Sequence, residues 1–358
     1  MRFYAGSAAA PVSGLLVKWA GFGYGPSVSL INTNGSFSAM TVAAGLGDGM
    51  LISPTARPVL SHVGFEVNWG LAIGACPIQA LPGFSNLSAE GNAADQLRVT
   101  DANLAIGDFV AFDEDNLIGG VVHFGETISI PDGSALHING EAACKMAMGT
   151  SIVASGELRI DGGTSGWTLG AIITDERDDE VGGDTNGDGA ITTPQPGGWR
   201  GIDLRTSDNE PILRRVLLCY GGAGAPAIRL GSVLATIDRC TIEHFAGNGI
   251  DANGSSHLHH VTRNRITDCG GEAILNVPIV ALDGYVDNEA ERNGFNWLKT
   301  LGFSVWASVS IGPENGIDDV IVFSQGAVVE DDVTLELKDV LIIMMGLGTE
   351  FRVVGRLV

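Results

Sequence analysis

The residues best suited to chemistry are the oxygen donors of one acidic, glycine-rich stretch. Residues 184–189 read D-T-N-G-D-G, which matches the first half of an EF-hand-type loop. Oxygen ligands two residues apart can converge on one hard cation, and the glycine allows the sharp turn. The twelfth position is Gln195 instead of glutamate, which argues against a true EF-hand. The missing charge would come from the nearby Glu176, Asp178, Asp179 or Glu180. The predicted ligands of a structural Ca²⁺ are Asp178, Asp179, Asp184, Asn186 and Asp188. The alternative is a solvated acidic loop.

A second set of charged residues recurs at equivalent positions of a repeat. Asp203, Arg229 and Asp251 each follow an isoleucine in a small–Ile–x pattern. Charges that alternate along such a column are typical of cross-strand pairing that stabilises a sheet. The alternative is a lyase-like groove, in which arginine removes the C5 proton of a calcium-bridged uronate and the carboxylates hold the metal.

The repeat itself predicts the elements that position these residues. Ile202, Ile228, Ile250 and Ile274 follow one another at spacings of 26, 22 and 24 residues. Repeats of 20–30 residues with strand patterns and no helices indicate a β-solenoid, in which inward Ile and Val side chains stack into one core. Asn264 falls at a turn, where we expect its amide to bond along the stack.

A longer repeat is also present, because residues 121–159 align without gaps to residues 320–358 at an offset of 199. A second solenoid unit is therefore expected near residue 320, and its last coil would present an open sheet edge. Either the chain is part of a longer repetitive protein, or the open C-terminal coil self-associates. The expected organisation is an N-terminal β-rich region or cap (1–117), a parallel β-helix (118–298) with an acidic insert (174–198), and a linker with the start of a second unit (299–358).

Composition excludes several classes of protein. The formal net charge is −22 with only four lysines, which argues against a nucleic-acid partner. No apolar run is long enough to predict a membrane span. The cysteines lack a Cys-x-x-Cys pair and are predicted to be buried single thiols, with a disulfide between Cys219 and Cys240 as the alternative.

The acidic stretch and the coils around it resemble secreted and surface bacterial right-handed parallel β-helix proteins, the pectin-lyase-like superfamily in the broad sense. The resemblance covers roughly residues 118–358 and is most specific in TDERDDEVGGDTNGDGAITTPQPGGW, where Gly198 replaces the usual aspartate. It implies the fold and leaves the function open, because this fold hosts lyases, hydrolases, adhesins and structural fibres.

We therefore predict an all-β, right-handed parallel β-helix with an N-terminal β-rich region. The expected role is that of a calcium-stabilised structural or adhesive protein, extracellular or at the cell surface, as a segment of a surface protein or a fibre-forming subunit. Expected partners are further copies of the chain, polysaccharides or cell-surface glycans. The alternative is a polysaccharide-active enzyme, most plausibly a calcium-dependent uronate lyase.

Overall fold

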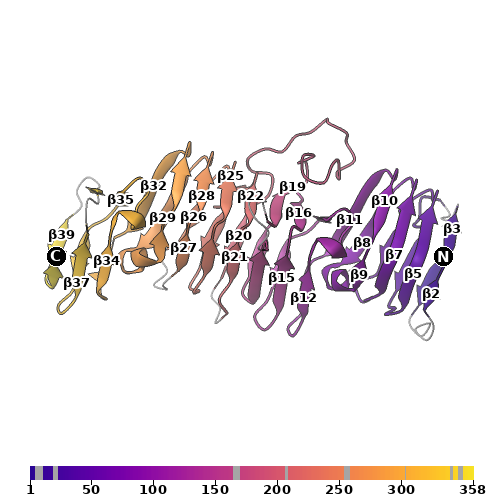
Figure 1. Cartoon of the computed structure of the whole chain (residues 1–358), viewed down its shortest axis with the longest axis horizontal. Coiled ribbons are helices and arrows are strands. Elements are labelled where there is room, and N and C mark those ends of the chain that lie inside the picture. Colours follow the sequence, from indigo (N-terminus) through magenta and orange to yellow (C-terminus); the bar gives the residue numbers. More distant parts are fainter. Residues whose placement is uncertain are drawn as a thin grey trace. The chain divides into compact units, whose positions relative to one another are not determined.

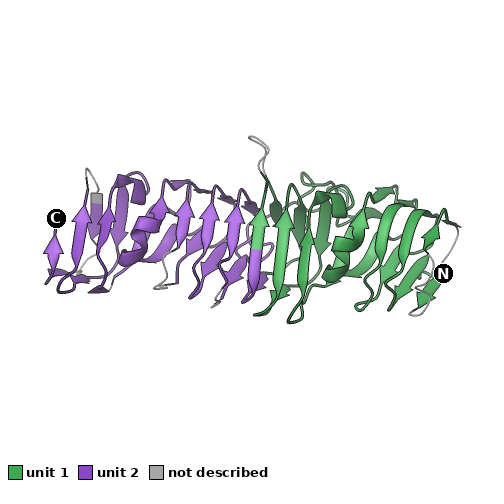
Figure 2. Ribbon diagram, turned by 60° about the horizontal axis from the view of Figure 1, so that its bottom comes forward, with its two compact units in different colours: residues 1–151, 159–194 green, residues 152–158, 195–358 purple. Residues whose placement is uncertain are grey.

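The chain folds as a parallel β-solenoid of about 13 turns, with 48% of its residues in strands and 6% in helices, and this confirms the predicted all-β, parallel β-helix fold (Figure 1). The computed structural model describes residues 1–4, 11–18, 23–163, 170–205, 209–253, 259–302, 304–338, 342–345 and 350–358. It divides into two compact units, unit 1 (residues 1–151 and 159–194) and unit 2 (residues 152–158 and 195–358), coloured separately in Figure 2.

Unit 1 contains three sets of parallel strands, β1-β4-β6-β8-β11-β13-β16-β19, β2-β5-β7-β10 and β12-β15. Its elements are β1 (Arg2–Tyr4), β2 (Val12–Ser13), β3 (Leu16–Lys18), β4 (Val28–Ile31), β5 (Ser36–Ala43), β6 (Met50–Ile52), β7 (Val59–Glu66), β8 (Leu71–Pro77), the 3₁₀ helix η1 (Ile78–Gly83), β9 (Phe84–Ser85), β10 (Ser88–Glu90), β11 (Ala94–Asp101), β12 (Phe109–Phe112), η2 (Glu114–Asn116), β13 (Val121–Phe124), β14 (Ile128–Ile130), β15 (Ala135–Asn139), β16 (Ala143–Met146) and β19 (Ile172–Asp175). Strand β18 (Glu157–Asp161) has residues in both units.

Unit 2 is built from five sets of parallel strands. They are β17-β20-β23-β26-β29-β32-β35-β38, β21-β24-β27-β30, β22-β25-β28-β31, β33-β36-β39 and β34-β37-β40. Its elements are β17 (Ile152–Ala154), β20 (Ile202–Leu204), β21 (Ile212–Arg214), β22 (Leu217–Cys219), β23 (Ile228–Leu230), β24 (Thr236–Asp238), β25 (Thr241–Glu243), β26 (Ile250–Asp251), β27 (His260–Thr262), β28 (Arg265–Thr267), β29 (Glu272–Pro278), η3 (Ile279–Gly284), β30 (Tyr285–Val286), β31 (Glu289–Glu291), β32 (Phe295–Leu301), β33 (Ser304–Val305), β34 (Val309–Ile311), η4 (Pro313–Asn315), β35 (Val320–Phe323), β36 (Ala327–Val329), β37 (Thr334–Leu337), β38 (Ile342–Met345), β39 (Phe351–Val353) and β40 (Arg356–Leu357).

The predicted isoleucine column forms the core of unit 2. Ile202, Ile228, Ile250 and Ile274 pair in register on β20, β23, β26 and β29, and all four are buried. Since parallel strands of neighbouring coils lie about 4.8 Å apart, each isoleucine packs on the same residue of the next coil. Burial of this continuous aliphatic stack is the main force that holds the coils together.

The described residues of the segment 1–117, which was expected to be a separate β-rich region or a cap, form coils in unit 1. Strands β4, β6 and β8 continue through β11 to β13 as one parallel ladder. The Asn-Gly pair at residues 34–35, a sequence typical of hairpin turns, does not close a hairpin here. Strands β4 and β5 on either side of this turn belong to different sheets, because the chain turns a solenoid corner there instead of reversing.

The long repeat is structural as well as sequential. Strands β13 and β15 recur as β35 and β37 at the predicted offset. The repeat also extends further upstream, because η1 and η2 recur as η3 and η4. In each copy an asparagine closes the same corner: Asn116 Nδ2 donates to the Phe84 carbonyl at 2.7 Å, and Asn315 Nδ2 donates to the Tyr285 carbonyl at 3.1 Å.

Two corners of unit 2 carry residues in the left-handed backbone region, and each corner forms a column along the coils. The first column is Arg215, Arg239, Arg263 and Asp287, with φ between 52° and 55°. The second column is Tyr220, His244, Asp268 and Arg292, with φ between 55° and 60°. Asparagine or glycine is the usual choice for this conformation, so long polar and charged side chains at successive corners set these columns apart.

The five cysteines are free and buried, as predicted for single thiols in core positions. They are Cys76, Cys144, Cys219, Cys240 and Cys269. Within the ranges that the structure describes, no helix has the length and apolar character needed to cross a membrane.

Candidate functional site

The acidic stretch forms a long excursion that leaves unit 1 after β19, and it is the large loop above β16 and β19 in Figure 1. It ends before Trp199, which is fully buried in unit 2. The Trp199 Nε1 donates to the Cys219 carbonyl at 2.8 Å, and the ring meets Phe245 edge to face. Trp199 therefore packs where the loop returns to the core.

Side chains of three neighbouring strands help to hold the excursion against unit 1. His123 Nε2 lies 2.8 Å from Glu176 Oε2, and Lys145 Nζ donates to the Gly183 carbonyl at 2.7 Å. Thr174 donates to Asp178, as described below. His123, Lys145 and Thr174 are paired in register on β13, β16 and β19. One column of three neighbouring strands therefore fixes successive points of the loop.

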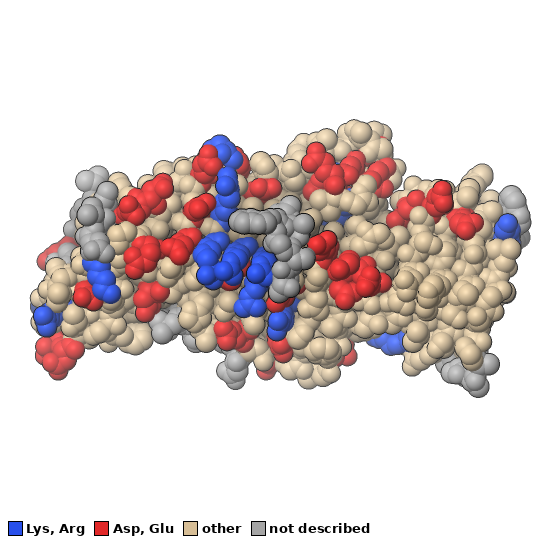
Figure 3. Space-filling view, viewed as in Figure 1, with Lys and Arg blue, Asp and Glu red and all other residues tan. Residues whose placement is uncertain are grey.

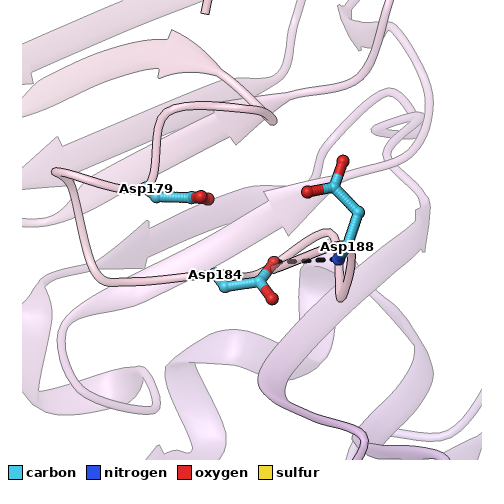
Figure 4. Close-up of side chains that lie close together, drawn as sticks. All are labelled: Asp179, Asp184 and Asp188. Atoms are coloured by element: carbon cyan, nitrogen blue, oxygen red, sulfur yellow. Dashed lines mark hydrogen bonds between the residues drawn. The ribbon is translucent and has the colours of Figure 1, made fainter. Parts of the chain in front are cut away.

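The excursion brings three of the predicted metal ligands together. One carboxylate oxygen from each of Asp179, Asp184 and Asp188 lies within 4.8 Å of the other two. Figure 4 shows Asp179 on one segment of the loop and Asp184 and Asp188 on the tight turn that faces this segment. This spacing would allow all three carboxylates to contact a single cation.

Local hydrogen bonds fix the shape of the turn. The Asp184 carboxylate accepts backbone N–H groups of Gly187 at 2.7 Å, Asp188 at 3.2 Å and Gly189 at 2.7 Å. Asp188 accepts from Asn186 Nδ2 at 3.1 Å and from the Thr192 hydroxyl. The hydrogen bond from Thr192 is the main cause of a lowered pKa of the Asp188 carboxyl, so Asp188 is held in its charged form.

Asp179 is the member of the cluster whose charge is least well compensated. Its Oδ1 is buried and has no hydrogen-bond partner among the described residues. Burial, followed by the nearby charge of Asp184, raises the pKa of its carboxyl, and Lys145 opposes that rise. A cation bound between the carboxylates would remove both causes. The donor set therefore fits a hard divalent cation such as Ca²⁺.

Asp178 and Asn186 are placed differently from the three carboxylates. Asp178 is buried, and its Oδ2 accepts the Thr174 hydroxyl at 2.7 Å. This carboxylate anchors the loop to β19. The Asn186 amide donates to Asp188, while its Oδ1 accepts the backbone N–H of Asp188 at 3.2 Å. Asn186 thus shapes the turn.

Lys145 is a functional residue that the sequence analysis missed. Its side chain is fully buried beneath the excursion. Burial lowers the pKa of its ammonium group, and the charges of Asp178, Asp179, Asp184 and Asp175 oppose that effect. It supplies one positive charge under a loop rich in carboxylates. A signal was available in the sequence, because a lysine is unusual in the middle of a buried strand such as ACKM.

The second predicted set, Asp203, Arg229 and Asp251, lies in register on β20, β23 and β26 of unit 2. The two aspartates contact residues outside this set. Asp203 pairs with Arg205 at 3.1 Å, and Asp251 accepts from Asn276 Nδ2 at 2.8 Å. Arg229 and Asp251 line a shallow depression of about 370 Å³ together with glycine and alanine residues of the neighbouring corners.

The fold and the site define a β-solenoid protein with an acidic excursion suited to a cation. Comparisons of the chain with protein-family models, with curated proteins and with solved structures found no match in any of the three. The resemblance to pectin-lyase-like proteins is therefore shown only as far as the parallel β-solenoid itself.

We expect the contact between His123 and Glu176 to make attachment of the excursion dependent on pH. The hydrogen bond from His123 is the main cause of a lowered pKa of the Glu176 carboxyl. Because the pKa of Glu176 is lower in the attached loop than its ordinary value of 4.5, its charged form stabilises attachment, and this stabilisation is fully present above pH 4.5. It is lost as the pH falls through the lowered pKa of the attached state. We expect the loss to be roughly 1 kcal/mol, since Glu176 is partly solvent-exposed.

Hydrogen exchange of the peptide spanning residues 172–194, corrected for intrinsic rates, measures this effect between pH 6 and pH 3. Glu176→Gln should exchange faster at pH 6 and lose most of the pH dependence. Glu180→Gln, at an exposed position of the same loop, is the matched control and should behave like the unchanged protein. An equal pH dependence in both variants would contradict the role of Glu176.

Proposed function

We propose that the chain is a structural or adhesive β-solenoid of an extracellular or cell-surface protein, and that Ca²⁺ bound by Asp179, Asp184 and Asp188 fixes its acidic excursion. The observation that carries the proposal is the convergence of these three carboxylates within 4.8 Å on a loop already anchored at His123, Lys145 and Thr174. A cation there would hold a protruding loop in one conformation.

The role of the ion in this proposal is structural. The turn is built from backbone N–H groups that orient Asp184, and the ligands come from one short segment. Few carboxylates on a surface loop give the modest affinity typical of extracellular modules, with dissociation constants of about 10⁻⁴–10⁻³ M. Such a site fills only where calcium is abundant, which supports an extracellular or cell-surface location.

Calcium titration by isothermal calorimetry and by thermal unfolding tests the proposal. We expect binding in the range of about 10⁻⁴–10⁻³ M, and a stabilisation of about 2.7 kcal/mol where free calcium reaches 100 times the dissociation constant. The double variant Asp179→Asn/Asp188→Asn should lose both effects. Asp331→Asn/Asp332→Asn removes the same charge at exposed positions of unit 2 and should keep them. Calcium binding that survives the first double variant, or no binding at 10 mM, would overturn the proposal.

The adhesive part of the proposal implies partners at the surface. We include polysaccharides or cell-surface glycans, and further copies of the chain that associate through the C-terminal coils. In those coils Val353 on β39 and Leu357 on β40 are 41% and 47% exposed, and exposed apolar groups on strands favour association. Sedimentation of the protein in the calcium buffers of the titration reports such association.

The enzymatic alternative is favoured by one observation, the depression lined by Arg229 and Asp251. A lyase would need an unpaired base and carboxylates free to hold a metal. In the structure Asp203 and Asp251 already have the partners Arg205 and Asn276. Release of unsaturated products from an acidic polysaccharide, abolished by Arg229→Ala, is the result that would favour the enzyme over the structural role.

A further inference from the structure

Large apolar side chains project into solvent from the same corner of three successive coils in unit 1. They are Tyr24, Leu46 and Trp69, which are 84%, 41% and 68% exposed, and we call them the apolar row. Each lies four residues before a buried residue of one parallel ladder. These buried residues are Val28 on β4, Met50 on β6 and Ile73 on β8, which pair with one another in that order. The three corners are therefore structurally equivalent.

The corners of the apolar row stack closely, because a glycine follows each of its residues. A Cβ atom on Gly47 would lie 2.3 Å from the Tyr24 carbonyl oxygen, and one on Gly70 would lie 2.7 Å from the Gly47 carbonyl carbon. The Trp69 backbone N–H donates to the Gly45 carbonyl at 2.9 Å. Since neighbouring coils lie about 4.8 Å apart, Tyr24 and Trp69 are separated by about 10 Å along the coils.

The equivalent corner of unit 2 carries small residues. The positions four residues before the last three isoleucines of the core column are Gly224, Ala246 and Gly270. The two corners share a hydrogen bond: the Leu71 N–H donates to Asp48 Oδ1 at 2.8 Å in unit 1, and the Glu272 N–H donates to Asn248 Oδ1 at 2.8 Å in unit 2. The corner therefore folds without large side chains, so the apolar row is not needed to build it.

Charge near the apolar row is sparse and acidic. Residues 1–47 contain no aspartate or glutamate, although the chain as a whole carries a net charge of −22. In Figure 3 the N-terminal end of unit 1 is largely tan, with its acidic side chains in a few small groups. The charges nearest to the row in the sequence are those of Asp48, two residues after Leu46, and Glu66, three residues before Trp69. These carboxylates would repel an anionic ligand, so an uncharged ligand suits the row better.

The size of the apolar row favours a narrow ligand. A tyrosine or tryptophan side chain buries about 150–250 Å² when it is fully covered, so the row exposes roughly 400 Å². A stable protein interface buries about 800 Å² on each partner, and the row alone is too small to hold a second copy of the chain. Exposed apolar patches of a few hundred Å² are often functional, and a single file of side chains suits a linear polymer.

We propose that the apolar row binds an uncharged linear polysaccharide. The C–H groups on the face of a sugar ring pack against the electron-rich face of an aromatic ring, and the polar edges of tyrosine and tryptophan bond to sugar hydroxyls. A separation of about 10 Å suits alternate rings of an extended glycan, with Leu46 beneath the ring between them. The inference rests on the adhesive role proposed above, for which it names a glycan-binding surface, and it is independent of the calcium site.

Affinity electrophoresis in native gels that contain EDTA and one soluble polysaccharide tests the proposal. Hydroxyethyl cellulose, arabinoxylan and galactomannan are the uncharged polymers, and polygalacturonate is the acidic comparison. We expect at least one uncharged polymer to retard the protein and polygalacturonate to have no effect. Tyr24→Ala/Trp69→Ala should weaken the binding at least tenfold. Phe109→Ala/Trp306→Ala, which removes two aromatic side chains that are 63% and 57% exposed elsewhere, should change it less than twofold.

Single variants of Trp69 separate stacking on an aromatic face from general apolar contact. Trp69→Tyr keeps a ring and should retain most of the binding, whereas Trp69→Leu keeps an apolar side chain and should lose it. No retardation by the three uncharged polymers, equal losses in the two double variants, unchanged binding by Trp69→Leu, or stronger retardation by polygalacturonate would each overturn the proposal. Self-association that Tyr24→Ala/Trp69→Ala abolishes in sedimentation would assign the row to a protein interface instead.

The calcium titration described above separates failure of this inference from failure of the proposed function. Tyr24→Ala/Trp69→Ala removes no charged residue and should bind calcium like the unchanged protein. An absence of polysaccharide binding beside normal calcium binding would therefore overturn the role of the apolar row alone.

Discussion

Replacing Trp199 with alanine is expected to lower the free energy of unfolding of unit 2 by about 3–5 kcal/mol. Trp199 is the largest fully buried side chain in the described part of the chain. Alanine would leave a cavity beside Phe245, whose ring now lies 5.7 Å from the indole. It would also leave the Cys219 carbonyl without the indole N–H that it now accepts.

Urea unfolding followed by circular dichroism gives the change in free energy for Trp199→Ala. Trp306→Ala is the matched control, because Trp306 lies in the same unit and is 57% exposed. Its substitution should change the free energy by less than about 0.5 kcal/mol. Similar losses in the two variants would mean that Trp199 does not close the core of its coil as described.

Replacing Asn264 with leucine is expected to cost about 3 kcal/mol or more, because it leaves several buried polar groups without partners. The Asn264 side chain is buried at a corner. Its Oδ1 accepts the Cys240 backbone N–H at 2.9 Å, and its Nδ2 donates to the Ile237 carbonyl at 2.9 Å and to Asn288 Oδ1 at 3.0 Å. These contacts confirm the expectation that its amide bonds along the stack, since they link three successive coils.

Asn264→Asp separates the lost hydrogen bonds from the lost shape. The introduced carboxyl could still accept from Cys240, but in its charged form it could not donate to Ile237. Burial raises the pKa of such a group, so the loss of stability should be larger at pH 7 than at pH 4. Thermal unfolding at the two pH values measures the difference. A loss that does not depend on pH would contradict the donor role of the Asn264 amide.

The sequence predicted those parts of the fold in which the same residue type recurs at the same place in each coil. The isoleucines on β20, β23, β26 and β29 are such a case. In unit 1 the equivalent core positions hold different residues: Val28 pairs with Met50, and Met50 pairs with Ile73. A buried position requires only an apolar side chain of suitable size. The sequence of residues 1–117 therefore shows no visible repeat from one coil to the next.

The candidate site likewise has one part that the sequence predicted and another part that it did not. Residues 184–188 form a local turn whose geometry depends on nearby backbone groups, so the spacing of its aspartates could be interpreted directly. The anchors His123 and Lys145 lie 53 and 38 residues from Glu176 and Gly183, the residues that they contact. Only the parallel pairing of β13, β16 and β19 brings them under the loop, and no short-range pattern encodes that pairing.

The buried thiols give the molecule a set of internal chemical reporters. Burial raises the pKa of Cys269 to about 11 and that of Cys144 to about 12, so these groups stay protonated and unreactive while their coils are closed. A thiol-specific reagent would therefore modify each cysteine only when its own coil opens. Mass spectrometry of the modified peptides would then rank the opening rates of individual coils in both units, with no introduced label.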